Sequence, residues 1–384
     1  MTATKKSYYP YFDYLRIVLV SIVMLGHDGL IAWSYSGKLA VDVFFALSGW
    51  LIGGILIRTD TKDLPRFYFN RALRIWVPYY IAFTLILIAS LLKDPINFKW
   101  LEFISYKLTW VYNIFGPPQL QACRDFMPLD GTGNHFWSVN AEEQFYLLAP
   151  LLLVIFAKHG RQLVTWFLIV VSLWFMGIYA PISFGVLAAL ANSKYPGFHT
   201  KKISKIIQSL ILIGSTIGLA VTTDYKLYSP PFAICVVLLL AIKGEKSFMG
   251  NFLGGMSYPL YLNHWIGVFF FNLILDPFGL RDSGLRHFLS VLMNYGIAAV
   301  LYWYVERRVL AMREKIYTIK KGIVFTKMAY FSINIGLIFG IILNPSFHAA
   351  IIVTIFISTT YLILSAVFGG NVQGIRGSTT SNSK

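Results

Sequence analysis

The sequence has 384 residues, of which 57% are hydrophobic and only 13% are charged. Soluble domains are about 45–50% apolar and about 25% charged, so the composition excludes a soluble globular protein and indicates a multi-pass membrane protein. The formal net charge of +16 does not indicate a nucleic acid partner, because the basic residues follow the distribution expected of a membrane topology.

Apolar runs along the chain predict an all-α fold, a polytopic transmembrane helical bundle of about ten core spans followed by a C-terminal two-helix hairpin. Several runs are short, and one short pair is a candidate re-entrant segment. The expected spans are 14–33, 39–57, 75–92, 143–157, 163–179, 181–192, 206–222, 231–242, 257–275, 288–305, 328–343 and 348–369.

The basic residues are distributed unequally between the two sides of this topology. If the N-terminus is cytoplasmic and the spans alternate, the inner segments hold 24 Lys and Arg residues and the outer segments hold 8, with Arg16 left in the membrane. This asymmetry is what the positive-inside rule requires. We therefore expect a multi-pass membrane protein whose N-terminus is cytoplasmic.

Four segments are expected along the chain. Residues 1–310 form a membrane domain, 311–327 a basic cytoplasmic linker, 328–370 an extra transmembrane hairpin with a packing or assembly role, and 371–384 a polar tail. The outer segment 93–142 is longer than most loops and rich in aromatic residues, which favours a folded lid.

The first span, FDYLRIVLVSIVMLGHDGLIAW, contains Arg16 and His27. Eleven residues along an α-helix correspond to about 1100°, close to three full turns, so both side chains project from one face with a rise of roughly 16 Å between them. Ionisable groups inside a membrane are costly, and they are functional candidates by default.

The second span begins VDVFFALSGWLIGG and carries Asp42 at its predicted outer end. A carboxylate near a histidine can fix its tautomer and stabilise the imidazolium during proton transfer, and an N-cap at a helix start is an equally good interpretation of Asp42. Small residues further along would let another helix or a ligand approach closely. They are Ser48, Gly49, Gly53 and Gly54.

The third span begins FYFNRALRIWVPYY, in which Arg71 and Arg74 are three residues apart and share a helix face at the cytoplasmic end. Two guanidinium groups on one face can bind phosphates in a bidentate manner. The alternative is a topological anchor, which any basic loop supplies.

The fourth motif is HFWSVNAEEQFYLLAP. Glu142 and Glu143 point about 100° apart on a helix, so at most one of them can face a shared site. One then compensates the helix dipole, and the other orients His27 or binds a hydroxylic acceptor. Candidate substrate-binding residues stand close by in the sequence, namely Trp137, Ser138 and Tyr146.

The fifth motif, MSYPLYLNHWIG, places His264 in a span. His264 is a candidate substrate-binding residue, and the alternative is a histidine that is merely hydrogen-bonded to a neighbour. The chain has only two cysteines, Cys123 and Cys235, so a cysteine metal cluster is excluded and we expect no metal.

The order of these five motifs resembles that of the bacterial membrane acyltransferase-3 family, over roughly residues 8–310. Members of that family are multi-pass enzymes that transfer acyl groups, usually acetyl, from cytoplasmic acyl-CoA to sugars of surface glycans, so the resemblance implies a bacterial inner (plasma) membrane location. The resemblance implies that His27 is the catalytic histidine with Arg16 as its partner, that the family's Arg-x-x-Arg pair is Arg71 and Arg74, and that the acid is Glu142. The hairpin beyond residue 327 exceeds the usual ten spans.

These features predict an acyl-CoA-dependent O-acetyltransferase. Arg71, Arg74 and Arg16 would hold the CoA phosphates, and the thioester would meet His27. His27 would act as general base on the acceptor hydroxyl or as a nucleophile that forms an acyl-imidazole, oriented by Asp42 or Glu142. The sequence leaves open which route operates.

Two other classes of protein share some of these features. A multi-pass transporter or flippase for a lipid-linked sugar would also carry embedded charges, but no inverted repeat is detected. A non-catalytic scaffold is disfavoured by the number of ionisable groups at membrane depth. The sequence leaves undetermined the acceptor sugar, the acyl length, the role of the hairpin and the oligomeric state.

Overall fold

The computed structural model describes residues 8–117 and 127–379; Cys123 lies outside them. The described residues form helices and contain no β-strand, which confirms the all-α fold. Six of their helices are long and apolar enough to cross a membrane, and 163–176, 225–240 and 265–278 are shorter apolar helices. The chain is a multi-pass membrane protein built as a helical bundle.

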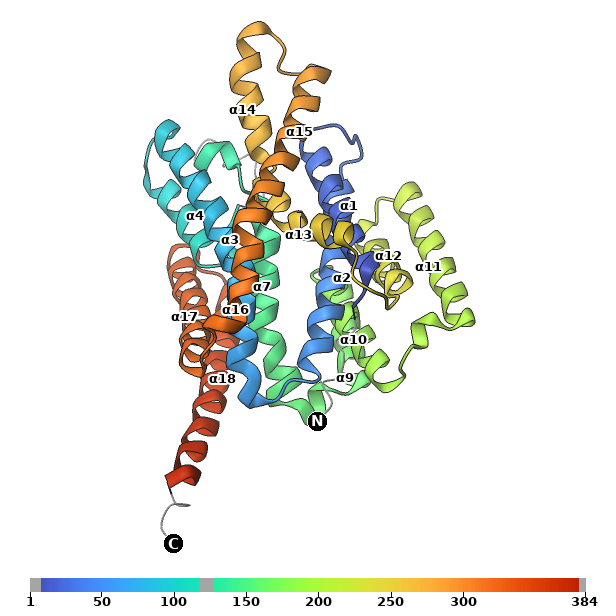
Figure 1. Cartoon of the computed structure of the whole chain (residues 1–384), viewed down its shortest axis with the longest axis vertical. Helices are drawn as coiled ribbons and strands as arrows, with labels where there is room; N and C mark the ends of the chain where they lie inside the picture. Colours follow the sequence, from blue (N-terminus) through green and yellow to red (C-terminus); the bar gives the residue numbers. More distant parts are fainter. Residues whose placement is uncertain (1–7, 118–126, 380–384) are drawn as a thin grey trace. The chain divides into compact units, whose positions relative to one another are not determined.

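The chain divides into two compact units. Unit 1 comprises residues 1–57 and 158–307, and the helices of its second segment follow one another from green to orange in Figure 1. Its helices are α1 (Pro10–His27), α2 (Ser36–Leu56), α8 (Ala157–Gly160, which begins one residue before the segment), α9 (Leu163–Met176), α10 (Ala180–Lys194), α11 (Lys202–Val221), α12 (Tyr225–Leu240), α13 (Phe248–Asn263), α14 (Trp265–Leu275) and α15 (Gly284–Leu301).

The closest helix packing in unit 1 joins α2 to α10. A Cβ added at Gly49 would lie 2.0 Å from the carbonyl oxygen of Ile182, and one added at Gly185 would lie 2.2 Å from the carbonyl oxygen of Ala46. Only glycine permits this approach of two backbones, as expected for small residues at a transmembrane helix interface. The predicted close approach is confirmed at Gly49, whereas Gly54 faces open space.

The connections of unit 1 contact one another in two groups. At one end, the amide of Gly244 donates to the carbonyl oxygen of Tyr8 (3.1 Å), so the α12–α13 connection meets the start of α1. The ring of His199 bonds to the carbonyl oxygen of Ala241 at 2.9 Å, which adds the segment before α11 to this end. The other group includes the α1–α2 and α14–α15 connections, joined by Asp28 and Arg286.

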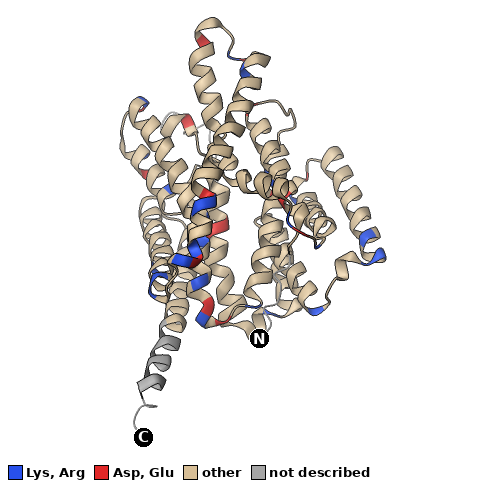
Figure 2. Cartoon of the chain, in the orientation of Figure 1, with Lys and Arg blue, Asp and Glu red and all other residues tan. Residues whose placement is uncertain are grey.

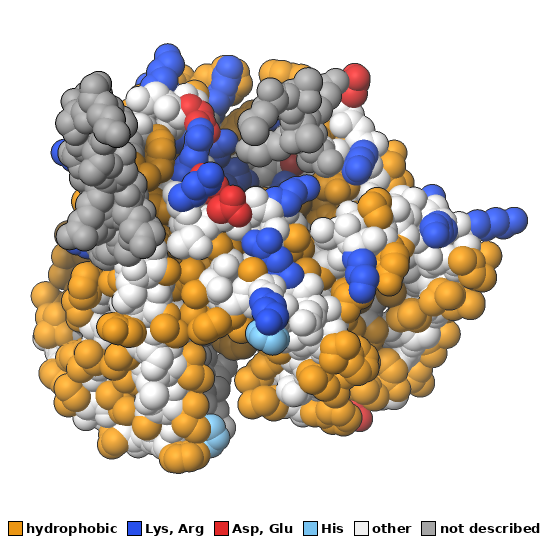
Figure 3. Space-filling view, turned by 90° about the horizontal axis from the view of Figure 1, so that it is seen from below, with side chains coloured by type: hydrophobic (Ala, Val, Ile, Leu, Met, Phe, Trp, Pro, Cys, Tyr) orange, Lys and Arg blue, Asp and Glu red, His pale blue; other side chains and the backbone are white. Residues whose placement is uncertain are grey.

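Charged residues mark these ends, and apolar residues cover the helices between them. In α11, Lys and Arg are confined to the first turns, and the rest of the helix is free of charge (Figure 2). The basic side chains at this end project at the right edge of Figure 3, next to hydrophobic side chains. Apolar helix surfaces with charged ends are the pattern of membrane-embedded helices.

Unit 2 comprises residues 58–157 and 308–384. The helix α3 carries Arg71 and Arg74, and the predicted lid is folded where it is described, as α4, α5 and a short 3₁₀ turn at Pro128–Gly131. The helices are α3 (Leu64–Lys93), α4 (Phe98–Leu108), α5 (Tyr112–Phe115), α7 (Phe136–Pro150), α16 (Arg307–Ile316, which begins one residue before the segment), α17 (Ile319–Leu343) and α18 (Phe347–Thr379).

The C-terminal hairpin α17–α18 packs inside unit 2. A Cβ at Gly322 would lie 2.9 Å from Pro65 of α3, and one at Gly336 would lie 2.2 Å from Thr109 beside α4. Within the predicted linker 311–327, α16 ends at Ile316 and α17 begins at Ile319, so most of this basic segment is helical.

A break in α7 gives the hairpin a polar attachment. Pro150 ends α7 and a π-helical turn follows at Leu151–Ile155, so the amide of Leu151 bonds to Leu148 instead of to Leu147. The hydroxyl of Tyr330 in α17 donates to the carbonyl oxygen of Leu147 at 2.7 Å. The hydroxyls of Tyr330 and Tyr68 lie 2.7 Å apart, so α3, α7 and α17 share one buried network.

Candidate active site

The helix α1 carries Arg16 and His27, as the sequence predicts. It runs without interruption from Pro10 to His27, so the spacing of eleven residues is a helical spacing and the two side chains share a face. The helix ends at His27 because Asp28 leaves the helical conformation and Gly29 has a φ of +77°. His27 therefore lies at a helix terminus, where its ring is exposed.

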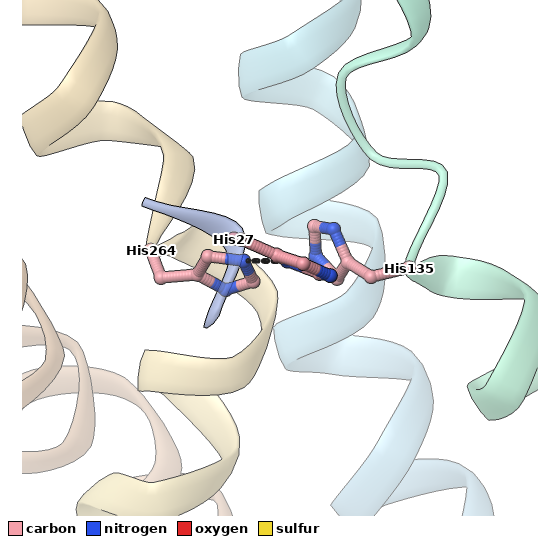
Figure 4. A group of neighbouring side chains, drawn as sticks. All are labelled: His27, His135 and His264. Atoms are coloured by element: carbon pink, nitrogen blue, oxygen red, sulfur yellow. Dashed lines mark hydrogen bonds between the residues drawn. The ribbon is translucent and has the colours of Figure 1, made fainter. Parts of the chain in front are cut away.

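The ring of His27 pairs with that of His264 from the junction of α13 and α14 (Figure 4). His27 Nδ1 lies 2.9 Å from His264 Nε2, and the ring centroids are 5.1 Å apart. His264 is buried, with 4% of its surface exposed. The structure thus brings together two histidines that are 237 residues apart in the sequence.

A backbone carbonyl fixes the protons of this pair. His264 Nδ1 lies 2.8 Å from the carbonyl oxygen of Tyr261, which can only accept, so His264 Nδ1 carries the proton. In a neutral His264 the Nε2 atom is then the acceptor, and His27 Nδ1 donates to it. It follows that His27 Nε2 carries a lone pair instead of a proton, which is the state that a general base or a nucleophile requires.

The predicted span 257–275 is broken at His264, and a neighbouring helix holds the residue at this break. His264 caps the end of α13 and the beginning of α14. Asn294 of α15 spans the break, since its Nδ2 donates to the carbonyl oxygen of His264 (2.6 Å) and its Oδ1 accepts from the amide of Gly267 (2.8 Å). Backbone groups freed by a broken helix need such partners inside a membrane.

An ion cluster holds the residue that follows His27. Asp28 forms a salt bridge with Arg286, and His287 Nδ1 lies 2.9 Å from the other oxygen of Asp28. The side chains of Asp28 and Arg286 are 2% and 6% exposed. A buried pair of this kind restrains geometry more than it adds stability, because desolvation offsets much of the attraction. It fixes the α1 terminus against α15.

Arg16 lies one turn from a carboxylate of its own helix. Its Nη1 donates to Asp13 Oδ1 at 2.9 Å, and Asp13 also accepts from the hydroxyl of Tyr8. Gly254 of α13 allows this group to approach closely, because a Cβ there would lie 2.6 Å from Asp13. The sequence predicted Arg16 as a ligand of CoA phosphates, and the structure adds Asp13 as its ion-pair partner.

Asp42 bonds to a tyrosine that the sequence did not associate with it. Asp42 Oδ2 accepts from the hydroxyl of Tyr225, the first residue of α12, at 2.6 Å. Lys38 Nζ lies 4.6 Å from the centre of the Tyr225 ring. Asp42 is six residues inside α2, which begins at Ser36, so it is not the N-cap of that helix. Its predicted role in orienting His27 stays a prediction, and His27 Nδ1 contacts His264.

In unit 2, the third and fourth motifs meet. The Arg71 guanidinium of α3 lies 5.6 Å from the centre of the Tyr146 ring of α7, and the Tyr146 hydroxyl donates to the Glu142 carboxylate. Arg74 lies one turn further along the face of α3 that carries Arg71. This group combines guanidinium cations with a carboxylate and a phenol, which suits a polar or anionic ligand.

The second glutamate of the fourth motif is buried. Glu143 is 4% exposed and its Oε1 accepts from the indole Nε1 of Trp76 at 2.9 Å. Its Oε2 has no hydrogen-bond partner among the described residues. Ser138 bonds locally to the carbonyl oxygen of His135 (3.1 Å), and Trp137 is half-buried on α7. Glu142 and Glu143 thus have different neighbours, as their angular separation predicts.

A buried lysine lies in the outer segment. Lys107 of α4 is 1% exposed, its Nζ donates to the carbonyl oxygen of Thr132 at 3.2 Å, and burial lowers its pKa to about 7. The ring of Tyr112 lies 5.0 Å from the same nitrogen. Burial thus favours a neutral amine, which donates a hydrogen bond without the desolvation cost of a charge.

The sequence reasoning missed the residues that orient the histidine. Asn294 was detectable as an amide inside the apolar run 288–305, and Arg286 as a basic residue just before it. Tyr261 acts through its backbone carbonyl, for which a sequence carries no signal. Trp76, which donates to Glu143 and not to the histidine pair, was hidden because a tryptophan in an apolar span looks like ordinary core.

Comparison with known proteins shows that this chain is similar to acyltransferases. The acyltransferase domain family matches residues 9–305. The peptidoglycan O-acetyltransferase OatA of Listeria monocytogenes is 29% identical over 175 residues, which are 41% of this chain and 26% of that protein. The O-acetyltransferase OatA of Staphylococcus aureus is 28% identical over 326 residues, which are 69% of this chain and 51% of that protein. The chain thus spans about half or less of the length of these curated relatives, and no solved structure matches it.

Proposed function

Because this chain belongs to the acyltransferase-3 family, whose domain matches residues 9–305, we propose that it is an integral-membrane O-acyltransferase. It moves an acetyl group from cytoplasmic acyl-CoA to a hydroxyl of an extracytoplasmic glycan. The names of the two relatives support acetyl as the acyl group and a glycan such as peptidoglycan as the acceptor. The His27–His264 pair carries the proposal, because the bond at Nδ1 leaves the lone pair of the His27 imidazole on Nε2.

His27 Nε2 performs the transfer by one of two routes. As a general base, it takes the proton of the acceptor hydroxyl while the oxygen attacks the thioester carbonyl, the C–S bond breaks, and CoA leaves with that proton as a thiol. As a nucleophile, it attacks the thioester carbonyl and the C–S bond breaks, which gives an acyl-imidazole and CoA thiolate; the acceptor oxygen then attacks the acyl carbon, the C–N bond breaks, and the hydroxyl proton passes to the thiolate. In both routes His264 accepts the Nδ1–H bond that orients the ring.

The donor's phosphates bind to guanidinium groups. Arg71 and Arg74 share a face of α3, and planar guanidinium forks match phosphate oxygens. Arg16 contributes a further cation on α1, and Asp13 limits its rotation. Glu142, bonded to Tyr146 next to Arg71, sets the position of the ring on which Arg71 lies. Trp137, Ser138 and Asp42 are assigned to the acceptor side.

The membrane orientation follows from charge. With the N-terminus in the cytoplasm of a bacterial plasma membrane, the basic residues of the 243–246 and 194–205 segments face the same compartment as the N-terminus. The contacts of these segments within unit 1 support this grouping, since Gly244 bonds to Tyr8 and His199 to Ala241.

The decisive experiment measures transfer of radiolabelled acetyl from acetyl-CoA to glycan by the purified full chain in nanodiscs. His27→Ala is expected to lower transfer to background while insertion and thermal unfolding stay normal; His348→Ala, in the first turn of α18, is the matched control. Full transfer by His27→Ala contradicts the proposal. Without acceptor, label trapped on the wild-type protein selects the nucleophilic route. A flippase would bind no acetyl-CoA.

A further inference from the structure

Aromatic side chains gather in the connection that follows His27. Trp33 and Tyr35 lie between α1 and α2 and are 39% and 38% exposed. Tyr225, the first residue of α12, lies beneath Tyr35 and is buried, with 6% exposed. We call these three residues the aromatic shelf. None of them has a part in the transfer chemistry described above, so their arrangement needs another explanation.

The shelf is ordered by specific contacts. The rings of Tyr35 and Tyr225 are stacked, with centroids 4.8 Å apart and planes at 15°, and Trp33 meets Tyr35 edge-on at 6.1 Å. Tyr225 is itself fixed, because its hydroxyl donates to Asp42. One face of Tyr35 is therefore covered by Tyr225, while the residue as a whole remains 38% exposed.

Charged groups border these rings. Lys38 Nζ lies 4.6 Å from the centre of the Tyr225 ring, and the carboxylate of Asp42 lies at the hydroxyl of the same tyrosine. An ammonium donor and a carboxylate acceptor thus stand beside apolar ring faces within one short stretch of α2. Ligand sites combine apolar aromatic surface with a few fixed polar groups in this way.

The shelf lies next to the last turn of α1. A Cβ added at Gly26 would lie 2.8 Å from Ser36 Oγ, so the first residue of α2 packs against the residue that precedes His27. Tyr35 immediately precedes Ser36 in the chain. A ligand on the exposed face of Tyr35 is consequently close to the terminus that presents the His27 imidazole.

A sugar ring matches this combination of groups. A pyranose carries apolar C–H faces, which stack on aromatic faces, and a rim of hydroxyls, which bond to ammonium and carboxylate groups. We propose that the aromatic shelf is the acceptor subsite, where Trp33 and Tyr35 bind a pyranose ring of the glycan while Lys38 and Asp42 bind its hydroxyls. This inference rests on the proposed function and names how its acceptor is held.

A membrane anchor is the other use of exposed aromatic residues. Independent anchors need only lie at interface depth. They do not need a stacked pair fixed by a buried Tyr225–Asp42 bond with a lysine over the ring. The built geometry therefore favours sugar recognition.

The test measures binding separately from catalysis. His27→Ala protein in nanodiscs is mixed with peptidoglycan disaccharides and neutral oligosaccharides of glucose, galactose and N-acetylglucosamine, and saturation-transfer NMR reports which sugar binds. We expect Tyr35→Leu and Trp33→Leu to weaken binding of that sugar at least tenfold, and Tyr35→Phe to change it less than threefold. The matched control is Trp303→Leu, an exposed tryptophan outside the shelf.

The outcomes are distinguishable. If no sugar binds, or if both leucine variants bind as well as their parent, the inference is wrong. If the leucine variants lose only thermal stability or insertion, the residues are membrane anchors and the inference is likewise overturned. Shelf-dependent binding by a wild-type protein that transfers no acetyl would instead refute the proposed function and support the subsite.

Discussion

Replacing His264 by phenylalanine removes the acceptor that faces His27 Nδ1 at 2.9 Å while keeping a planar ring at a buried position. A hydrogen bond of this kind contributes about 1–1.5 kcal/mol, which corresponds to about tenfold in the population of the productive tautomer. We therefore expect kcat to fall about tenfold with little change in KM for acetyl-CoA, because the lost interaction orients the reacting nitrogen and does not bind the donor.

His264→Gln provides the matched comparison. The glutamine side-chain oxygen can accept from His27 Nδ1, so we expect this variant to keep at least a third of wild-type kcat. The assay is acetyl transfer to glycan in nanodiscs, with thermal unfolding of each variant measured in parallel and His348→Phe as the control. Equal activity of His264→Phe and wild type, or an equally large loss in both His264 variants, would refute the orienting role.

Three further predictions address other parts of the chain. Arg71→Lys is expected to raise KM for acetyl-CoA about tenfold, because an ammonium group lacks the planar fork of a guanidinium. The control Arg66→Lys, on the exposed surface, should leave KM unchanged. An unchanged KM in Arg71→Lys would mean that Arg71 serves only to set the membrane topology. Gly185→Leu should destabilise the protein by at least about 1–3 kcal/mol, because a Cβ at this position meets the backbone of α2. The control Gly214→Leu lies in open space and should be tolerated. Equal melting temperatures of the two variants would contradict this packing. Lys107 has a folded pKa of about 7, below its unfolded value, so unfolding takes up a proton between these pKa values and stability rises with pH, by about 2 kcal/mol from pH 7 to 9. Lys107→Met should abolish that slope in unfolding measurements, and an unchanged slope would assign it to other groups.

The positions of the helices were largely readable from the sequence. Apolar runs located the spans, and helical periodicity placed Arg16 and His27 on one face, because both are properties of a single segment. The sequence also detected that Gly49 permits close packing, since a small residue in an apolar run has few other uses. It could not show that Ile182 of α10 is the partner.

The neighbours of the catalytic candidates were decided by tertiary structure. The sequence offered Asp42 and Glu142 as groups that orient His27, because a carboxylate is the commonest partner of a catalytic histidine. The fold adds His264 as a partner of His27, with its proton fixed by the Tyr261 backbone carbonyl, and it pairs Asp42 with Tyr225.

Residue types and spacings along one helix are local information, and they determined which segments enter the membrane and which residues are chemically capable. Hydrogen-bond partners that are 183 or 237 residues apart depend on how the helices pack, and a backbone carbonyl leaves no mark in a residue pattern. The sequence by itself therefore determined the membrane fold, the acyltransferase class and the candidate histidine. Only the tertiary structure decided the tautomer of that histidine and the ring stacking beside it, because both arise from contacts between helices that are distant along the chain.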